Sequence, residues 1–204
     1  MSLIPKKILQ IAIGEEYRKI IPLEKLRNLF QEINPEFTYI LFTEIECINF
    51  LCTYYPEYLD LYNILNRVQY KSDLIRYLYI YKYGGIYIDI DLSQTIKFEV
   101  LLQILNNATS FFTIGNGSEQ MANGFFGSVK DNIIFIECID EMIKKPNPEG
   151  YGANVMILYS ILSKKYSMIP YIIDRDTFFI KEIGIDNTYK YYIHPDHNCL
   201  VKWF

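Results

Sequence analysis

Two aspartates at the end of an apolar run are the residues of this 204-residue chain best suited to chemistry. The run Ile86-Tyr87-Ile88-Asp89-Ile90-Asp91 alternates with a period of two, so a strand here would turn Asp89 and Asp91 to one face. Carboxylate oxygens are the ligands that Mg²⁺ and similar cations prefer, often together with substrate phosphates. We therefore expect a metal-bound, phosphorylated ligand at this strand end. The alternative is that both acids end the strand and face water.

A short helix before this strand carries another pair of charged side chains. Asp73 and Arg76 are three residues apart, which places them on one helix face. Ser72 is a residue type that caps a helix N-terminus, and Gly84-Gly85 can end the helix because the position after a helix commonly needs a positive φ. The alternative for Asp73 is a helix-start acid that only pairs with Arg76.

The order and spacing of these residues resemble the signature of DXD-containing glycosyltransferases of the Och1-like mannosyltransferase and clostridial-toxin glucosyltransferase group. The matching segments are Ser72-Asp73, Arg76-Tyr77, Tyr83-Gly84-Gly85-Ile86-Tyr87 and Asp89-x-Asp91. The resemblance implies an α/β protein with the GT-A fold, a Rossmann-like nucleotide-diphospho-sugar transferase domain with a mostly parallel central sheet. It also implies an enzyme that transfers a hexose with retention of configuration at the anomeric carbon, and no covalent enzyme intermediate.

The same resemblance assigns roles to residues at the site. Asp91 would bind Mn²⁺ or Mg²⁺ directly, while Asp89 would share the metal or hold the ribose of the donor. Asp73, Arg76 and Asn123 would fix the hydroxyl groups of the donor sugar. For Asn123 an ordinary turn asparagine is an equal alternative.

The C-terminal segment holds both histidines and the only tryptophan. By resemblance to the closing motif of retaining GT-A enzymes, one histidine would complete the metal shell, and the spacing to Lys202 and Trp203 favours His197 over His194. Lys202 and Trp203 would bind the diphosphate, with Lys202 neutralising the charge on the leaving group. The alternative for Trp203 is an apolar residue that packs the tail.

The N-terminal run is similar to the opening strand of the family, which lies under the nucleotide. Ile11 and Ala12 would therefore contact the nucleotide. The family usually has His and Trp where this chain has Leu9 and Ala12, so the stacking partner of the base is missing. We expect a UDP-sugar as donor and a glycan or protein hydroxyl as acceptor.

Hydrophobic periodicity and turn signals predict the remaining elements. Strands are expected over residues 8–13, 39–42, 109–114, 169–173 and 178–180. Helices are expected over 22–34, 43–52 with Thr43 and Glu46 as a capping box, 98–106, 131–145 with Asp131 as the cap, and 155–165. Residues 116–123 are rich in turn formers.

Composition limits the classes of function. Half of the residues are hydrophobic, which suits one domain over residues 1–204 with a substantial core. The net charge of -4 without a basic block predicts no nucleic-acid partner. The cysteines Cys47, Cys52, Cys138 and Cys199 form no CxxC pair, which favours reduced thiols and a cytoplasmic location. No segment suits a signal peptide or a transmembrane helix.

Two other functions fit parts of the pattern. Asp89-Ile90-Asp91-Leu92-Ser93 also approximates the aspartate-nucleophile motif of haloacid-dehalogenase-type phosphohydrolases. That motif sits near the start of the chain in those enzymes, and no Gly-Asp or Asp-Asp pair follows it here. A non-catalytic module that binds nucleotide sugars is the remaining alternative.

Overall fold

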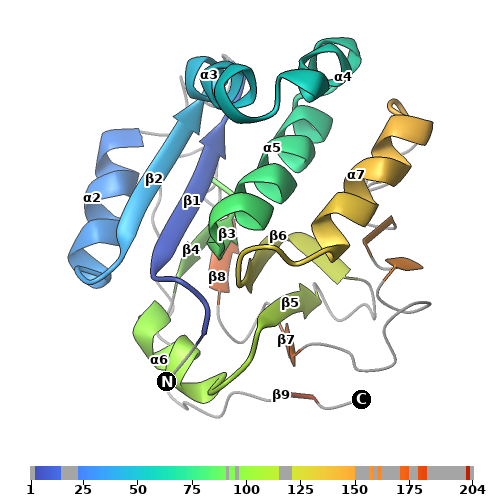
Figure 1. The fold of residues 1–204 in the computed structure, drawn as a ribbon. Coiled ribbons are helices and arrows are strands. Elements are labelled where there is room, and N and C mark those ends of the chain that lie inside the picture. The colour runs from blue at the N-terminus through green and yellow to red at the C-terminus, as the bar shows by residue number, and fades with distance from the viewer. Residues whose placement is uncertain are drawn as a thin grey trace.

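A seven-stranded sheet with helices on both faces forms the centre of the protein, which we describe from a computed structural model (Figure 1). The structure describes residues 3–14, 23–90, 92–94, 97–114, 121–149, 157–158, 160–161, 171–174, 179–182 and 201–202. The strands of the sheet follow the order β2-β1-β3-β6-β5-β7-β9, and β4 pairs with β8 in a separate two-stranded sheet.

The strands are β1 Lys7–Ala12, β2 Thr38–Thr43, β3 Gly85–Ile88, β4 Leu92–Gln94, β5 Ser110–Ile114, β6 Met121–Ser128, β7 Tyr171–Asp174, β8 Phe179–Glu182 and β9 Val201–Lys202. The helices are α2 Leu23–Ile33, α3 Glu44–Tyr54, α4 Leu59–Ile64, α5 Val68–Tyr83, α6 Phe98–Ile104 and α7 Ile134–Lys144, with a short 3₁₀ helix at Pro56–Tyr58. Most of the strands and helices predicted from hydrophobic periodicity are present, with ends shifted by a few residues.

The sheet is mixed and not clearly mostly parallel, so the predicted strand direction is met only in part. β1 runs parallel to β2 and β3, and β5 runs parallel to β7. β6 runs antiparallel to both β3 and β5, and β9 runs antiparallel to β7. β6 was not predicted, because Asn123, Gly124 and Gly127 are turn formers. Gly127 is instead a point of close approach, since a Cβ there would lie 2.4 Å from the Phe111 ring.

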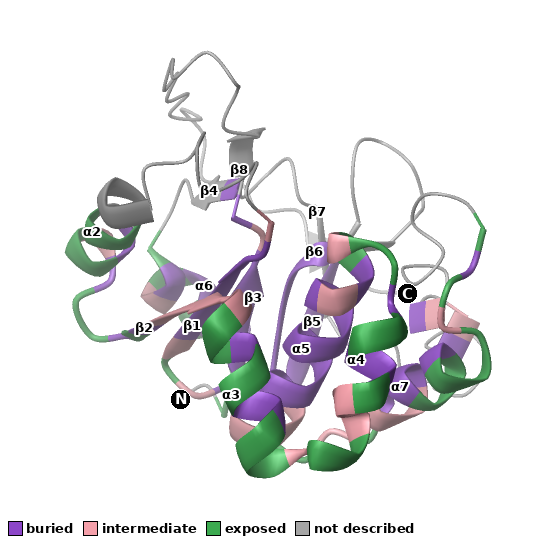
Figure 2. Cartoon of the chain, turned by 90° about the horizontal axis from the view of Figure 1, so that it is seen from above, coloured by how far each residue is buried: buried purple, intermediate pink, exposed green. Residues whose placement is uncertain are grey.

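Alternation along the strands divides the interior into two clusters of buried residues. One cluster joins Leu9, Ile11 and Tyr87 to residues of α3, α5 and α7. The other joins Ile8 and Ile86 to residues of α2 and α6. α5 is the most deeply buried helix, with residues 72–80 all buried, and it is purple over most of its length in Figure 2.

Local signals set several helix ends. α5 begins after Arg67, so Ser72 lies inside the helix and does not cap it as predicted. Gly84 and Gly85 have φ values of 64° and 114°, as expected for the stop after α5. The capping box at the start of α3 is present, with the Thr43 N–H donating to Glu46 Oε2 at 2.9 Å.

Two further predictions have different outcomes. At the start of α7 the Ile134 N–H donates to Oδ1 of Asn132 at 3.3 Å, so Asn132 takes the role that was predicted for Asp131. The helix predicted over 155–165 lies largely outside the described residues, although 157–158 and 160–161 are helical. Among the described helices, none is both long enough and apolar enough to cross a membrane.

Phe126 on β6 provides a test of the core between the sheet and α5. It is fully buried, and its ring centroid lies 5.5 Å from that of Tyr87 and 5.5 Å from that of Phe135. Phe126→Ala should lower the free energy of unfolding by about 3–5 kcal/mol, because it removes these contacts and leaves a cavity. Ile143→Ala on α7 is the control, since Ile143 is 48% exposed. Urea unfolding of both variants measures the difference, and equal losses would contradict this assignment of the core.

Candidate functional site

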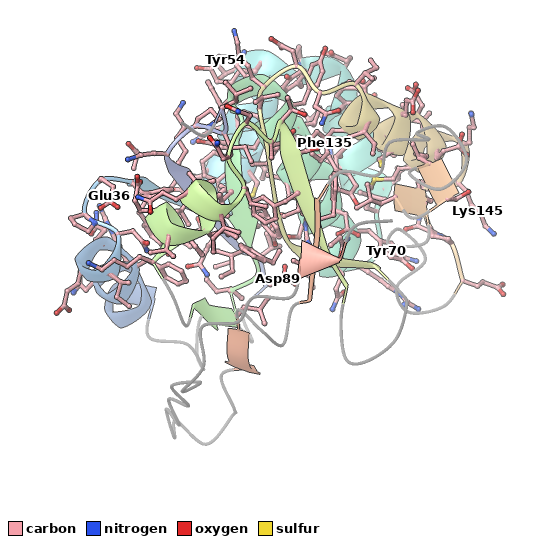
Figure 3. The ribbon with its side chains drawn as sticks, turned by 90° about the horizontal axis from the view of Figure 1, so that it is seen from below. Glu36, Tyr54, Tyr70, Asp89, Phe135 and Lys145 are labelled. Atoms are coloured by element: carbon pink, nitrogen blue, oxygen red, sulfur yellow. The ribbon has the colours of Figure 1, made fainter. Side chains whose placement is uncertain are left out.

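The candidate site lies where β3 ends, next to the first turns of α5. Asp89 directly follows β3, and its N–H donates to the Gly124 carbonyl of β6 at 2.7 Å. Tyr70 at the start of α5 and Asp89 lie toward the same end of the molecule in Figure 3, and Tyr54 lies at the opposite end. Residues of α5, β3 and β6 therefore meet at one end of the sheet.

Arg76 is the centre of the polar network at this end, and it is buried at 5% exposure. Its Nε donates to the Ser72 carbonyl at 3.3 Å, and its Nη2 donates to Ser72 Oγ at 2.9 Å. Its Nη1 donates to the Asn123 carbonyl at 2.8 Å. The guanidinium also forms ion pairs with Asp73 Oδ1 at 3.3 Å and Asp89 Oδ1 at 3.2 Å. All three guanidinium nitrogens thus bond to the protein.

The environment of Arg76 keeps it charged. Burial opposes the charge, but Tyr87, Asp89 and Asp73 outweigh this effect and raise the pKa of Arg76 above its ordinary value. The guanidinium carbon also lies 4.2 Å from the centroid of the Tyr87 ring. Arg76 is therefore a cation that positions its neighbours, and its contact with the donor sugar stays a prediction.

Tyr87 is a member of the site that the sequence analysis missed. Its hydroxyl donates to Asp89 Oδ1 at 2.6 Å and lies 3.4 Å from Ser72 Oγ. Burial raises the pKa of Tyr87 well above its ordinary value, so the phenol stays protonated and can donate. The signal was present in the sequence, because Tyr87 and Asp89 are two residues apart in an extended segment and share a face.

Asn123 belongs to β6 and is buried, so the alternative of an ordinary turn asparagine is wrong. Its Nδ2 donates to Asp73 Oδ1 at 2.8 Å and lies 3.5 Å from the Tyr77 hydroxyl. Asp73 is also buried and lies inside α5, not at its start. It forms the ion pair with Arg76 that its alternative predicted, but it also accepts from Asn123. The structure brings together four of the residues predicted for the site, Asp73, Arg76, Asp89 and Asn123.

The carboxylate of Asp89 has one oxygen held by the protein and another that faces the chain at Gly124. Oδ1 carries the contacts with Tyr87 and Arg76. A Cβ on Gly124 would lie 2.4 Å from Oδ2, so the carboxylate occupies the space that a side chain at 124 would fill. The Asp89 side chain is 35% exposed. A partly exposed carboxylate fits the hard cation predicted here.

The other predicted metal ligands, Asp91 and His197, lie outside the described residues, as do the alternative ligand His194 and the diphosphate-binding residue Trp203. Within the described part of the chain, no group of three or more His, Cys, Asp or Glu side chains is arranged so that it could hold a metal ion. Asp89 is therefore the one member of the predicted metal set whose surroundings the structure describes.

The residues predicted to bind the nucleotide lie on different strands and on different faces of the sheet. Ile11 and Ala12 are buried at the end of β1 and belong to different core clusters. Leu9 is buried too, which agrees with a packing role. Lys202 lies on β9, where it pairs with Ile172 of β7. Three strands, β6, β5 and β7, separate β9 from β3 in the sheet.

Comparisons with known proteins point to one class of enzyme. Residues 23–110 match the family model described as "Glycosyltransferase sugar-binding region containing DXD motif", and this range includes Asp73, Arg76 and Asp89. Inositol phosphoceramide mannosyltransferase 3 of Schizosaccharomyces pombe is 34% identical over 71 residues, 35% of this chain and 20% of that protein. Mannosyl phosphorylinositol ceramide synthase CSH1 of Saccharomyces cerevisiae is 29% identical over 141 residues, 66% of this chain and 36% of that protein. The chain thus spans only about a fifth to a third of these relatives.

Solved structures show a similar fold. The PaToxG glycosyltransferase has a TM-score of 0.58 at 18% identity, covering 80% of this chain and 69% of that chain. The glycosyltransferase GlyE of Streptococcus pneumoniae has a TM-score of 0.51 at 12% identity, covering 80% of this chain and 45% of that chain. The mixed α/β fold described above is therefore one that occurs in glycosyltransferases.

Replacing Arg76 tests the network. Arg76→Ala should lower the free energy of unfolding by about 3–5 kcal/mol, because it leaves the buried Asp73 carboxylate without its cation. Lys144→Ala is the control, because Lys144 and Glu141 form an ion pair in which both side chains are exposed. That variant should lose at most about 1 kcal/mol. Urea unfolding gives both values, and similar small losses would show that the network does not stabilise the fold.

Proposed function

The resemblance to DXD-containing glycosyltransferases is confirmed by the match over residues 23–110, and from this premise we propose that the protein transfers a hexose from a nucleotide-diphosphate sugar to a hydroxyl group. The proposal includes a GT-A domain over the whole chain, dependence on a divalent cation, and retention of configuration without a covalent enzyme intermediate. The similarity of the fold to glycosyltransferase structures supports it.

The observation that carries the proposal is the network that joins Asp73, Arg76, Asn123 and Asp89 across three elements. A carboxylate and a carboxamide side by side can accept and donate hydrogen bonds, which suits the hydroxyl groups of a sugar. Asp73 and Asn123 would hold the sugar, and Arg76 would position both through its contacts with the Asp73 carboxylate and the Asn123 carbonyl.

Asp89 and Asp91 would hold a divalent cation, Mn²⁺ or Mg²⁺, with His197 as the third protein ligand. Bound there, the cation would neutralise negative charge on the departing diphosphate. Asp89 would contribute through Oδ2, because Oδ1 already accepts from Tyr87 and pairs with Arg76. Asp91 would accordingly be the more direct ligand, and Lys202 and Trp203 would contact the diphosphate.

The names of the relatives suggest which sugar and acceptor to test first. Both curated relatives are named for mannosyl transfer, and their names include an inositol-containing ceramide. We extend the proposal to mannose as the first donor sugar and to a hydroxyl of a glycan, protein or inositol phosphate as acceptor. UDP stays the nucleotide that we propose for the donor, and the cytoplasm stays the proposed location.

Asp91→Asn tests dependence on the cation. Wild-type protein should bind UDP with Mn²⁺ and lose most of this affinity when EDTA is added, whereas Asp91→Asn should bind weakly in both conditions because it lacks a charged ligand. Asp60→Asn is the control, because Asp60 is an exposed acid on α4. Isothermal titration calorimetry measures the affinities. Equal UDP affinity with and without EDTA in wild-type protein would contradict the metal site.

Asp73→Asn tests the sugar subsite. Binding of free UDP should stay close to that of wild-type protein, while the transfer rate should fall roughly 100-fold because a contact to the reacting sugar is lost. Transfer is measured as nucleotide release from a panel of UDP- and GDP-activated hexoses. Weakening of UDP binding as large as the weakening of intact donor binding would argue against the sugar role.

The same assays separate the other functions. Release of phosphate from a phosphomonoester, without nucleotide release from any donor, would favour the phosphohydrolase. Nucleotide-sugar binding without turnover over a broad acceptor panel would favour a binding module.

A further inference from the structure

Gln10 and Tyr39 form a buried polar pair behind Asp89, outside the network around Arg76. Gln10 lies on β1 with no exposed surface, and Tyr39 lies on β2 at 8% exposure. The Gln10 Nε2 donates to the carbonyl oxygen of Asp89 at 3.1 Å, and the Tyr39 hydroxyl donates to Gln10 Oε1 at 2.6 Å. These two hydrogen bonds link β2, β1 and the end of β3, where Asp89 lies.

The orientation of the Gln10 amide follows from its partners. A backbone carbonyl can only accept a hydrogen bond, so the group that faces Asp89 must be Nε2. Oε1 then faces Tyr39, whose hydroxyl has to donate. Burial raises the pKa of Tyr39, so this hydroxyl keeps its proton, and the ring stacks on Phe30 at a centroid distance of 5.8 Å.

The side chain of Gln10 takes over where the backbone pairing ends. The described pairs between β1 and β3 are Ile8 with Ile86 and Leu9 with Tyr87, whereas β1 and β2 stay paired as far as Ala12 and Thr43. One residue beyond the last β1–β3 pair, Gln10 supplies a side-chain donor in this region.

The backbone of Asp89 is consequently held on two sides. Its N–H donates to the Gly124 carbonyl at 2.7 Å, and its carbonyl accepts from Gln10 at 3.1 Å. The same carbonyl accepts the N–H of Leu92, the residue after the Asp-x-Asp segment, at 3.1 Å. Gln10 thus donates to the same Asp89 carbonyl oxygen that accepts from Leu92 across the Asp-x-Asp segment.

We propose that Gln10 is a positioning residue for the Asp-x-Asp site, and that Tyr39 orients Gln10 for this role. The proposal rests on the proposed function, because it takes Asp89 and Asp91 as the residues that hold the cation and diphosphate. Groups that orient metal ligands typically change metal affinity by about 10- to 100-fold when they are removed.

Gln10→Met tests the proposal, because it keeps a long side chain and removes both polar atoms. Amide hydrogen exchange of Asp89 and Leu92, measured by NMR without ligand, should become at least about tenfold faster as the anchoring carbonyl loses its donor. Mn²⁺-dependent UDP affinity should fall about 10- to 100-fold. Tyr39→Phe, which keeps the ring on Phe30, should produce smaller changes in the same direction and carries the test if Gln10→Met does not fold.

Asn34→Leu is the matched control. Asn34 is also a buried amide that joins two backbone groups, with Nδ2 donating to the Phe30 carbonyl at 3.1 Å and Oδ1 accepting the Phe98 N–H at 2.9 Å. It should lower the unfolding temperature as Gln10→Met does, and it should leave exchange at Asp89 and Leu92 and the UDP affinity unchanged.

The outcomes separate this proposal from the proposed function. Wild-type protein that binds UDP with Mn²⁺, together with unchanged exchange or unchanged affinity in Gln10→Met, overturns the positioning role alone. Equal loss of UDP affinity in Asn34→Leu and Gln10→Met overturns it as well, since the effect would then be one of general stability. Wild-type protein without Mn²⁺-dependent nucleotide binding overturns the proposed function itself.

Discussion

A buried guanidinium between two carboxylates is the interaction on which the arrangement of the site depends. Arg76 pairs with Asp73 and Asp89 while it donates to the backbone of Ser72 and Asn123. Removing a charge from water costs several kcal/mol, and only a complete set of partners offsets that cost. α5, β3 and β6 therefore cannot move independently without leaving a charge or a carbonyl without its partner.

The antiparallel direction of β6 determines which of its residues lie next to Asp89. Gly85 pairs with Ser128 and Ile88 pairs with Phe125, so Asp89 falls opposite Gly124 and one residue from Asn123. If β6 ran parallel to β3, its residues would face those of β3 in the reverse order. The glycine at this position lets the Asp89 carboxylate lie against the backbone, where a Cβ would meet Oδ2 at 2.4 Å. The mixed sheet thus has a direct consequence for the site.

The sequence was enough to identify the charged residues of the site and most of the elements around it. Asp73, Arg76 and Asp89 are separated by spacings that periodicity can place on a helix face and at a strand end. Asn123 was found through the family resemblance, while its strand was missed because Asn and Gly signal turns when no pairing partner is known. The partners of Arg76 were not predicted for a different reason: a sequence does not show that two carboxylates, backbone carbonyls and a hydroxyl will surround one guanidinium.

The tyrosines and Gln10 show where pattern reading stops. In an apolar strand a tyrosine is read as packing, and Tyr87 does pack, with its ring centroid 5.5 Å from that of Phe126. Its hydroxyl acts separately, because it donates to Asp89 Oδ1. Likewise a glutamine in β1 has no visible partner in the sequence, since Asp89 lies 79 positions away. Long-range partners of buried polar atoms need the tertiary structure.

Asp89 is fixed in two independent ways, and the combination decides which atom is left to bind. Arg76 and Tyr87 hold Oδ1 of its side chain, while Gly124 and Gln10 hold the N–H and carbonyl of its backbone. With both the peptide and Oδ1 held, the direction of Oδ2 is set before any ligand arrives. Preorganised oxygens of this kind need little rearrangement on binding, and this is the property that an electrostatic site requires. An aspartate alone is common in proteins, whereas an aspartate whose side chain and backbone are both held by buried partners fits the binding role proposed for Asp89.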